Sequence, residues 1–267
     1  MSDLRATILG CGSSGGVPRI GGNWGDCDPD NPKNHRQRCS LLVERDGPDG
    51  TTTVLIDTSP DVRAQLLATG TSRLDGVVYT HAHADHVHGI DDLRMVVFNM
   101  RHRLTVWAHD ATYQDLSDRF GYVFEQPKGS SYPPILNRAR IDGAFEVDGP
   151  GGAIPFTPFE VNHGAMFTLG FRIGGLVYLP DVAVIPDTVW DTHLRDMDIW
   201  IIDALRKEPH PTHSHYSQTL SWIDRTAPKR AILTNMHIDL DYATVQDETP
   251  AHISPAFDGM VLHFPAP

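Results

Sequence analysis

The sequence has few cysteines, no long apolar run and no secretory signal. It has 3 cysteines in 267 residues, an odd number, which argues against the disulfide framework of small secreted domains. No apolar run reaches the roughly 20 residues needed to cross a bilayer. Residues 1–5 also lack the basic start of a signal peptide. We therefore expect a cytoplasmic protein with no membrane partner.

Positive charge is also scarce. Lys and Arg number 22 against 34 Asp and Glu, so the formal net charge is −12. An acidic chain lacks the basic face that grips nucleic acid, and we expect no nucleic-acid partner. A small anionic substrate remains compatible with this balance, because bound divalent metals would offset the negative charge where that substrate lies.

The rest of the composition is that of a globular protein, with 40% apolar and 21% charged residues. Alternating or continuous apolar runs predict strands, and longer periodic runs predict helices. We expect strands at 4–9, 40–44, 53–57, 77–80, 104–108, 145–147, 154–161, 168–173, 176–179, 199–203 and 231–234, helices at 58–69, 111–120, 184–194 and 217–226, and a short helix or turn at 90–97. This order predicts an α/β fold with two packed sheets and helices outside, in a single domain over 1–267.

Three segments are predicted to be irregular. Residues 10–16 form a glycine-rich loop that lacks the Lys-Ser/Thr ending of a nucleotide P-loop, so we interpret it as a flexible turn near the site. Residues 21–38 are predicted to be an ordered loop. The proline-rich segment 126–134 fits a surface loop, a mobile lid or a contact in a homodimer, and the sequence leaves these alternatives open.

The most informative stretch is 80–86, which follows a short apolar run. His81, His83, Asp85 and His86 place three imidazoles and a carboxylate within six residues. Imidazole and carboxylate without thiolate suit Zn²⁺ or Mn²⁺, and also Fe²⁺. Four candidate ligands exceed what one catalytic ion needs, so we expect two divalent metal ions.

Three later residues share one feature: each polar side chain lies at or just after the end of an apolar run. His163 follows 156–161, Asp181 follows 176–180, and His237 follows 231–234. Rigid scaffolds present site residues at strand ends. We therefore expect these residues to complete the metal site.

This pattern resembles the seven-ligand, phosphodiesterase-type site of the metallo-β-lactamase superfamily, and the resemblance covers nearly the whole chain. It implies a four-layered αβ/βα sandwich with the site at its mouth. It implies that His81, His83 and His163 hold one metal, that Asp85, His86 and His237 hold the other, and that Asp181 bridges them. A hydroxide between the two ions would be the nucleophile.

Other segments narrow the resemblance. Asp181 stands where many true β-lactamases have cysteine, and Asp85 where flavodiiron-type members have glutamate. Residues 10–18, 38–40, 89–94 and 212–213 resemble the phosphoribosyl 1,2-cyclic phosphate phosphodiesterases of the carbon–phosphorus lyase pathway. That resemblance implies that His213 acts as general acid, with His215 as the competing candidate. We count His213 and Asp85 as the catalytic candidates.

The chain departs from that family at a structural zinc site. Members carry several closely spaced cysteines and a histidine three residues beyond the last ligand. This chain has Cys27 in the loop and Leu240 at the histidine position, and adding Cys39 gives only two thiolates. We expect no structural zinc, which leaves the natural substrate open.

The sequence thus predicts a dinuclear phosphodiesterase for a small cyclic or nucleotide-like phosphodiester. The alternatives are a tRNA 3′-end endonuclease, a glyoxalase II-like thioester hydrolase and a non-catalytic metal-binding protein. For Asp57 two roles stay open, a hydrogen bond to a ligand histidine or a helix cap. Asp91, Asp92 and Arg94 are expected to brace the ligand loop, with binding of the substrate phosphate through Arg94 as the alternative. His88 is expected to be exposed or hydrogen-bonded, with a contact to a metal ligand as the alternative.

Overall fold

The computed structural model describes residues 3–266, which form two seven-stranded sheets. The first sheet has the order β14-β1-β2-β3-β4-β5-β6, with β1 (Asp3–Gly10), β2 (Ser40–Gly47), β3 (Gly50–Ile56), β4 (Gly76–Val78), β5 (Leu104–Ala108), β6 (Leu136–Arg140) and β14 (Val261–Pro265). The second has the order β13-β12-β11-β10-β9-β8-β7, with β7 (Phe145–Val147), β8 (Ile154–His163), β9 (Met166–Ile173), β10 (Leu176–Leu179), β11 (Ile199–Asp203), β12 (Arg230–Thr234) and β13 (Ile253–Pro255).

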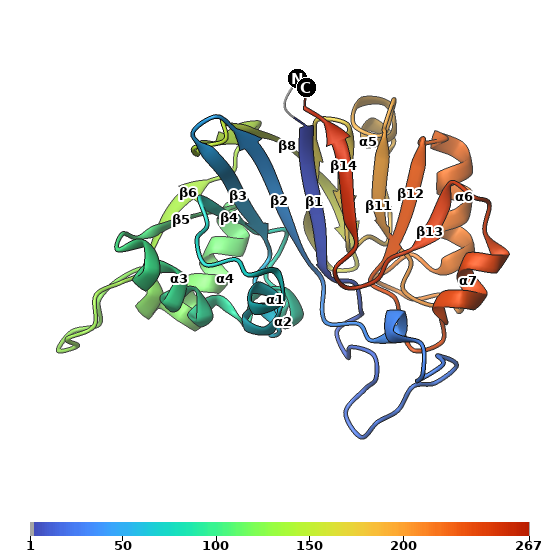
Figure 1. Cartoon of the computed structure of the whole chain (residues 1–267), viewed down its shortest axis with the longest axis horizontal. Helices are drawn as coiled ribbons and strands as arrows, with labels where there is room; N and C mark the ends of the chain where they lie inside the picture. The colour runs from blue at the N-terminus through green and yellow to red at the C-terminus, as the bar shows by residue number, and fades with distance from the viewer. Residues whose placement is uncertain (1–2, 267) are drawn as a thin grey trace.

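Helices cover the outer face of each sheet (Figure 1). On the first sheet lie α1 (Val62–Thr69), α2 (Ala84–Val87), α3 (Leu93–Met100) and α4 (Asp110–Phe120), and on the second α5 (Asp187–Thr192), α6 (Tyr216–Thr226) and α7 (Tyr242–Glu248). Three short 3-10 helices are η1 (Pro32–Asn34), η2 (Ile90–Asp92) and η3 (Gly121–Val123). The predicted αβ/βα sandwich is confirmed. Within residues 3–266, no helix is long and apolar enough to cross a membrane.

The alternation of side chains along the first sheet explains why it is covered on both faces. In β2, Leu41 and Val43 face the core between the sheets, whereas Leu42 packs with the helical side. In β3, Val54 faces the inner core and Leu55 the outer one. Successive residues of a strand point to opposite faces, so a continuous apolar run predicts a strand buried on both sides.

Parallel pairing determines where the strands end. The neighbours β3 to β6 pair in parallel in the first sheet, and β10 to β13 in the second. Their carboxyl ends therefore lie at the same edge, at the bottom of Figure 1, opposite the two termini. The loop 11–39 lies at this edge too and projects beyond the sheets.

Several predicted bounds differ from the observed ones. The helix expected at 184–194 is reduced to α5, and α1 begins only at Val62. We did not predict β6, β13, β14 or α7. The edge strand β6 reads Leu-Asn-Arg-Ala-Arg and has one buried residue, so it lacks the apolar pattern on which strand prediction depends.

The segment 126–134 projects from the side of the first sheet that carries α3 and α4 (Figure 1). Tyr132 within this segment is 73% exposed. None of its residues is among those that line the cavity over the metal cluster, within the part of the chain described. A homodimer contact here stays a prediction.

A buried leucine and an exposed leucine give a prediction for the stability of the fold. We expect Leu41→Ala, at a fully buried position between the sheets, to lower the free energy of unfolding by roughly 2–5 kcal/mol, because it leaves a cavity in close-packed surroundings. Leu67→Ala, at a position that is 65% exposed, is the matched control and should change it by less than about 1 kcal/mol. Urea denaturation measures both. Equal effects would contradict the assignment of the inner core.

Candidate metal centre

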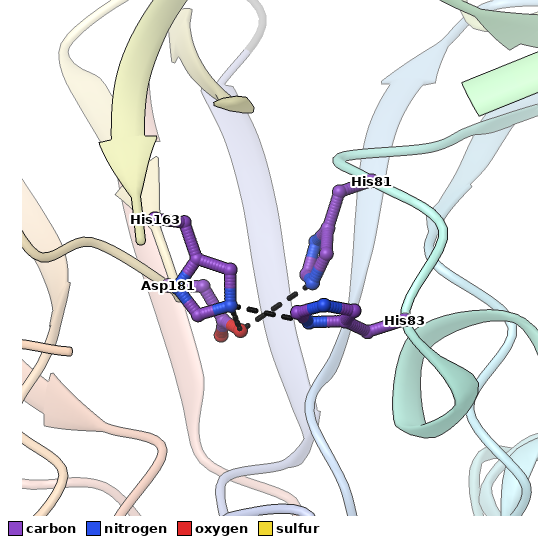
Figure 2. Close-up of side chains that lie close together, drawn as sticks. All are labelled: His81, His83, His163 and Asp181. Atoms are coloured by element: carbon purple, nitrogen blue, oxygen red, sulfur yellow. Dashed lines mark hydrogen bonds and ion pairs between the residues drawn. The ribbon is translucent and has the colours of Figure 1, made fainter. Parts of the chain in front are cut away.

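Four predicted ligands meet where the two sheets come together (Figure 2). His81 and His83 follow β4 of the first sheet, whereas His163 ends β8 and Asp181 follows β10 of the second. One ligand atom from each of the four lies within 4.8 Å of the others. His83 is exposed and the other three are buried. The group therefore opens to solvent on one side only.

The Asp181 carboxylate has imidazoles on both sides. Its Oδ2 lies 3.5 Å from Nε2 of His81 and 3.6 Å from Nε2 of His163. Its Oδ1 lies 3.4 Å from Nε2 of His86, which is itself 3.7 Å from Oδ2 of Asp85. Each carboxylate oxygen thus faces a different group of candidate ligands.

The residues present fit divalent metal ions. Nε2 of His81 and Nε2 of His86 are buried and have no hydrogen-bond partner among the described residues. Burial, and then the nearby His86, lower the pKa of His81, and burial lowers the pKa of His163 to about 4. Both rings are therefore neutral at pH 7, with lone pairs ready for a metal.

Asp57 fixes the His86 ring from behind. Its Oδ2 accepts hydrogen bonds from Nδ1 of His86 at 2.8 Å and from the Thr80 hydroxyl at 2.7 Å. Its Oδ1 accepts from the Thr80 backbone N–H at 2.8 Å. Of the two roles left open for Asp57, the geometry shows the hydrogen bond to a candidate ligand; the residue that precedes α1 is Asp61. A carboxylate behind a ligand imidazole orients the ring and raises its basicity.

His86 differs from the other imidazoles in charge. Burial disfavours its charged form, but Asp181 and Asp57 outweigh burial and raise its pKa well above the ordinary value. A metal ion at Nε2 therefore has to displace a proton. It follows that metal affinity should increase with pH.

The remaining two predicted ligands lie beside this group. His237 points Nδ1 at Oδ1 of Asp239, 3.2 Å away, and its Nε2 contacts the guanidinium of Arg19. Asp85 and His237 line a cavity of about 230 Å³. The full lining is Ser13, Ser14, Arg19, His83, Asp85, Asp181, Leu205, Arg206, His210, His213, Asn235 and His237.

His213 occupies the wall of this cavity beside the ligands. Its Nδ1–H donates to Oδ2 of Asp203 at 2.8 Å, and its ring centroid is 4.5 Å from that of His163. Burial disfavours the charged form, but the Asp203 carboxylate outweighs it and raises the pKa of His213 to about 9. His215 precedes α6 and is not among the lining residues.

The sequence analysis missed Asp203 and Asn235. The Asn235 amide donates to Oδ1 of Asp181 at 3.1 Å and to Oδ1 of Asp203 at 3.3 Å, joining the metal ligands to the His213 pair. Its φ of 58° is left-handed, a region that asparagine tolerates better than most residues. Asp203 ends the apolar strand β11, so the rule applied to Asp181 would also have found it.

The other residues weighed from the sequence have structural partners. Arg94 pairs with Asp91 at 2.8 Å, and exposed His88 packs edge-on against Phe120.

Cys27 and Cys39 of this loop are free thiols with different partners. Cys27 lies 3.8 Å from a guanidinium nitrogen of Arg36, whereas Cys39 lies 3.7 Å from the Thr234 hydroxyl. Arg36 is buried and donates to the carbonyls of Leu240 at 2.7 Å and His237 at 3.3 Å. In this chain an arginine thus connects the loop 11–39 to the segment that carries His237.

The comparison with protein families agrees with this geometry. Residues 52–238 match the model of the beta-lactamase superfamily domain. The chain belongs to the metallo-β-lactamase superfamily. Together with the His/Asp cluster, membership indicates a metal-dependent hydrolase that binds divalent ions.

The chain is similar to several known proteins, of which three are described here. The crystal structure of a diphosphatase from the PhnP family is 36% identical in sequence and superposes with a TM-score of 0.87. The match covers 99% of this chain and 98% of that one. The octanoyltransferase of Porphyromonas gingivalis is 31% identical over 264 residues; 96% of this chain matches 51% of that protein, so the chain spans about half its length. Human tRNase Z, short form, shares the fold with a TM-score of 0.67 at 15% identity, over 97% of this chain and 98% of that one. The chain thus resembles the PhnP family, as the sequence predicts.

The contact between Asp57 and His86 gives a testable prediction about metal affinity. Asp57→Asn should weaken metal binding about 10- to 100-fold, because it removes the carboxylate that orients His86. Asp75→Asn is the matched control: Asp75 also accepts from a strand N–H, that of Thr53 at 2.8 Å, and belongs to neither group of ligands. Metal titration followed by elemental analysis measures both, and affinity should increase from pH 6 to pH 8. Unchanged affinity in Asp57→Asn would refute the role given to Asp57.

Proposed function

We propose that the chain is a dinuclear metal-dependent phosphodiesterase that hydrolyses a small cyclic or nucleotide-like phosphodiester, of the phosphoribosyl cyclic phosphate type. One observation carries the proposal. His213 lies in the same cavity as the ligand cluster, and the Asp203 carboxylate holds its Nδ1 and raises its pKa to about 9. Cleavage of a phosphodiester needs a proton for the departing alkoxide, and this pair is placed to supply it.

The ligand set proposed is that expected from the sequence. His81, His83 and His163 would hold one divalent ion, Asp85, His86 and His237 the other, and Asp181 both. Zn²⁺ or Mn²⁺ bound there would activate water and offset the charge of the phosphate. The support is the division of the Asp181 oxygens: Oδ2 faces the imidazoles of His81 and His163, and Oδ1 faces the imidazole of His86.

The chain's own residues then have separate tasks. Asp57 and Asp203 each hold Nδ1 of an imidazole, which directs Nε2 of His86 and His213 away from them. Water adds to phosphorus as the bond from phosphorus to the leaving oxygen breaks. His213 gives its proton to the leaving oxygen, and the proton that the attacking water loses restores the acid form of His213. Asn235 keeps Asp203 aligned with Asp181.

The size and charge of the site favour a small substrate over a polynucleotide. The cavity of about 230 Å³ suits a small phosphate ester. The net charge of −12 offers no extended basic surface for tRNA. The similarity to tRNase Z extends to the fold alone.

A second candidate is the hydrolysis of a diphosphate. It is favoured by the 36% identity to a protein described as a diphosphatase. The chemistry is closely related, since water again attacks phosphorus and a phosphate oxygen leaves. Thioester hydrolysis is less favoured, because a thiolate leaves without a proton and would not need His213.

The proposal is tested by hydrolysis of bis(p-nitrophenyl) phosphate, a diphosphate and an acyl thioester, on protein reconstituted separately with Mn²⁺ and Zn²⁺. We expect diester cleavage that is lost on chelation. Asp181→Ala should lower both activity and metal content, because it removes a carboxylate that faces both groups of candidate ligands. Thioester cleavage alone would support the glyoxalase-like alternative instead, and no cleavage of any substrate would favour a metal-binding protein.

The role of His213 is tested by the leaving group and by pH. His213→Ala should keep its metals and lose about 10²- to 10⁴-fold in rate on an alkyl diester, but far less on p-nitrophenyl esters, whose leaving group needs no proton. Since the pKa of His213 is raised, its acid form is present at low pH and is lost as pH rises through about 9. Asp203→Asn should therefore move the alkaline fall of kcat to lower pH. A leaving-group effect in His215→Ala rather than in His213→Ala would transfer the role to His215.

A further inference from the structure

His237 differs from the other candidate ligands in how the fold holds it. His163 lies in β8 and Asp181 two residues beyond β10, whereas His237 comes three residues after the end of β12. The segment that bears it, 235–241, leads from β12 to α7. The His237 N–H donates to the Leu205 carbonyl, in another loop, at 2.8 Å. Contacts between loops therefore determine where its ring lies.

Arg36 holds this segment from the other side. It is 2% exposed, and its guanidinium donates to the Leu240 carbonyl at 2.7 Å and to the His237 carbonyl at 3.3 Å. It also donates to Oδ1 of Asn34 at 3.2 Å. A guanidinium is planar and presents its donors in a fixed arrangement. One rigid group thus fixes the carbonyls at both ends of this short stretch.

Arg36 is itself anchored on two sides. Its backbone exchanges two hydrogen bonds of 2.9 Å with Val17. Asn34, which accepts from the guanidinium, donates to Oδ2 of Asp241 at 2.6 Å and accepts from the Tyr242 N–H at 2.8 Å. Asp241 is the residue that caps α7. These contacts connect the start of α7 to the loop that carries Arg36, which lies beside it (Figure 1).

The charge of Arg36 makes this arrangement costly. Its acceptors are two backbone carbonyls, an amide and the thiol of Cys27, and its buried Nε has no partner among the described residues. A buried cation with neutral partners costs free energy, and an apolar side chain of similar length would fill the same space at lower cost. Packing alone therefore does not account for a guanidinium at this position, whereas its hold on the two carbonyls does.

We propose that Arg36 positions His237 for the second metal ion, and that a site without this arginine holds one ion in place of two. This inference rests on the proposed function, whose ligand set it uses, and it adds a positioning residue to that set. The guanidinium contacts the His237 carbonyl, so it acts through the backbone. The ion expected at His81, His83 and His163 has no ligand on this segment and should be bound without Arg36.

Replacing the guanidinium by an apolar side chain of similar length tests the proposal. Arg36→Met should weaken the binding of one Mn²⁺ ion at least 10-fold, as the loss of a contact that supports a ligand does, and that of the other less than 3-fold. Calorimetric titration gives both affinities, and elemental analysis gives the number of ions bound. By electron paramagnetic resonance, wild type should show the coupled signal of a Mn²⁺ pair, and Arg36→Met should show isolated ions at the same metal concentration.

A double-mutant cycle tests whether Arg36 acts through His237. His237→Ala should remove the same ion. Adding Arg36→Met to it should then change the affinity for the remaining ion less than 3-fold, because no ligand is left to position. Arg36→Lys should keep part of the second affinity, since an ammonium retains the charge and some of the donors. It also decides the test if Arg36→Met does not fold.

Arg172→Met is the matched control. The Arg172 guanidinium also donates to backbone carbonyls, at 2.7–3.2 Å, on a segment without candidate ligands; they belong to Gly174, His193, Arg195 and Asp196. This variant should be less stable in urea denaturation but should keep both ions. The comparison separates a positioning role from a merely structural one.

The outcomes distinguish this inference from the proposed function. Unchanged affinities in Arg36→Met, equal weakening of both ions, loss of the second ion in Arg172→Met, or a single ion in wild type would overturn the inference. A wild type that binds two ions but hydrolyses no phosphodiester would count against the proposed function alone, because the metal titration still decides the role of Arg36.

Discussion

The carboxylate of Asp181 is buried between imidazoles that come from both sheets, and the geometry of the site depends on it. A charge removed from water is costly unless it is paired and hydrogen-bonded. Here His81, His86 and His163 surround the carboxylate, and the Asn235 amide donates to it. The contacts between Asp181 and these imidazoles form only when the two sheets are packed together. The packing of the sheets and the site therefore stabilise one another.

The ligands at strand ends and the sandwich fold were predictable from the sequence. Apolar runs that end in polar ligands predict a strand and a site at once, and His81, His163 and Asp181 all follow that rule. The αβ/βα sandwich was predictable for the same reason, because consecutive residues at 54–56 and 199–202 are apolar and buried. The local pattern of apolar residues predicts the strands and the ligands at their ends, even when the pairing of the strands is unknown.

The residues that support the ligands were not predictable, because their roles depend on contacts between distant segments of the chain. Asn235 bonds to Asp181 and Asp203, which lie 54 and 32 residues away in the chain. Arg36 reaches Leu240 across 204 residues and Arg19 reaches His237 across 218. No periodic pattern marks an arginine in a loop as buried or as part of a site. Within the loop 11–39, the sequence predicts an ordered segment over 21–38 and a flexible turn over 10–16, but it gives neither of these arginines a role.

The residues of the site lie on two kinds of structural element, strand ends and loops. The candidate metal ligands lie at or near strand ends, and both sheets hold them: the Leu169 N–H of the second sheet donates to the Thr80 carbonyl of the first at 3.1 Å. His213 and Arg36, by contrast, lie on the loops 204–215 and 11–39. A change in a loop can alter which group is protonated or how His237 is held without disturbing the ligands at the strand ends. On this argument, a fold that is shared at 15% identity can carry different loops, because the packing of the sheets maintains the candidate ligands while the loops are free to change.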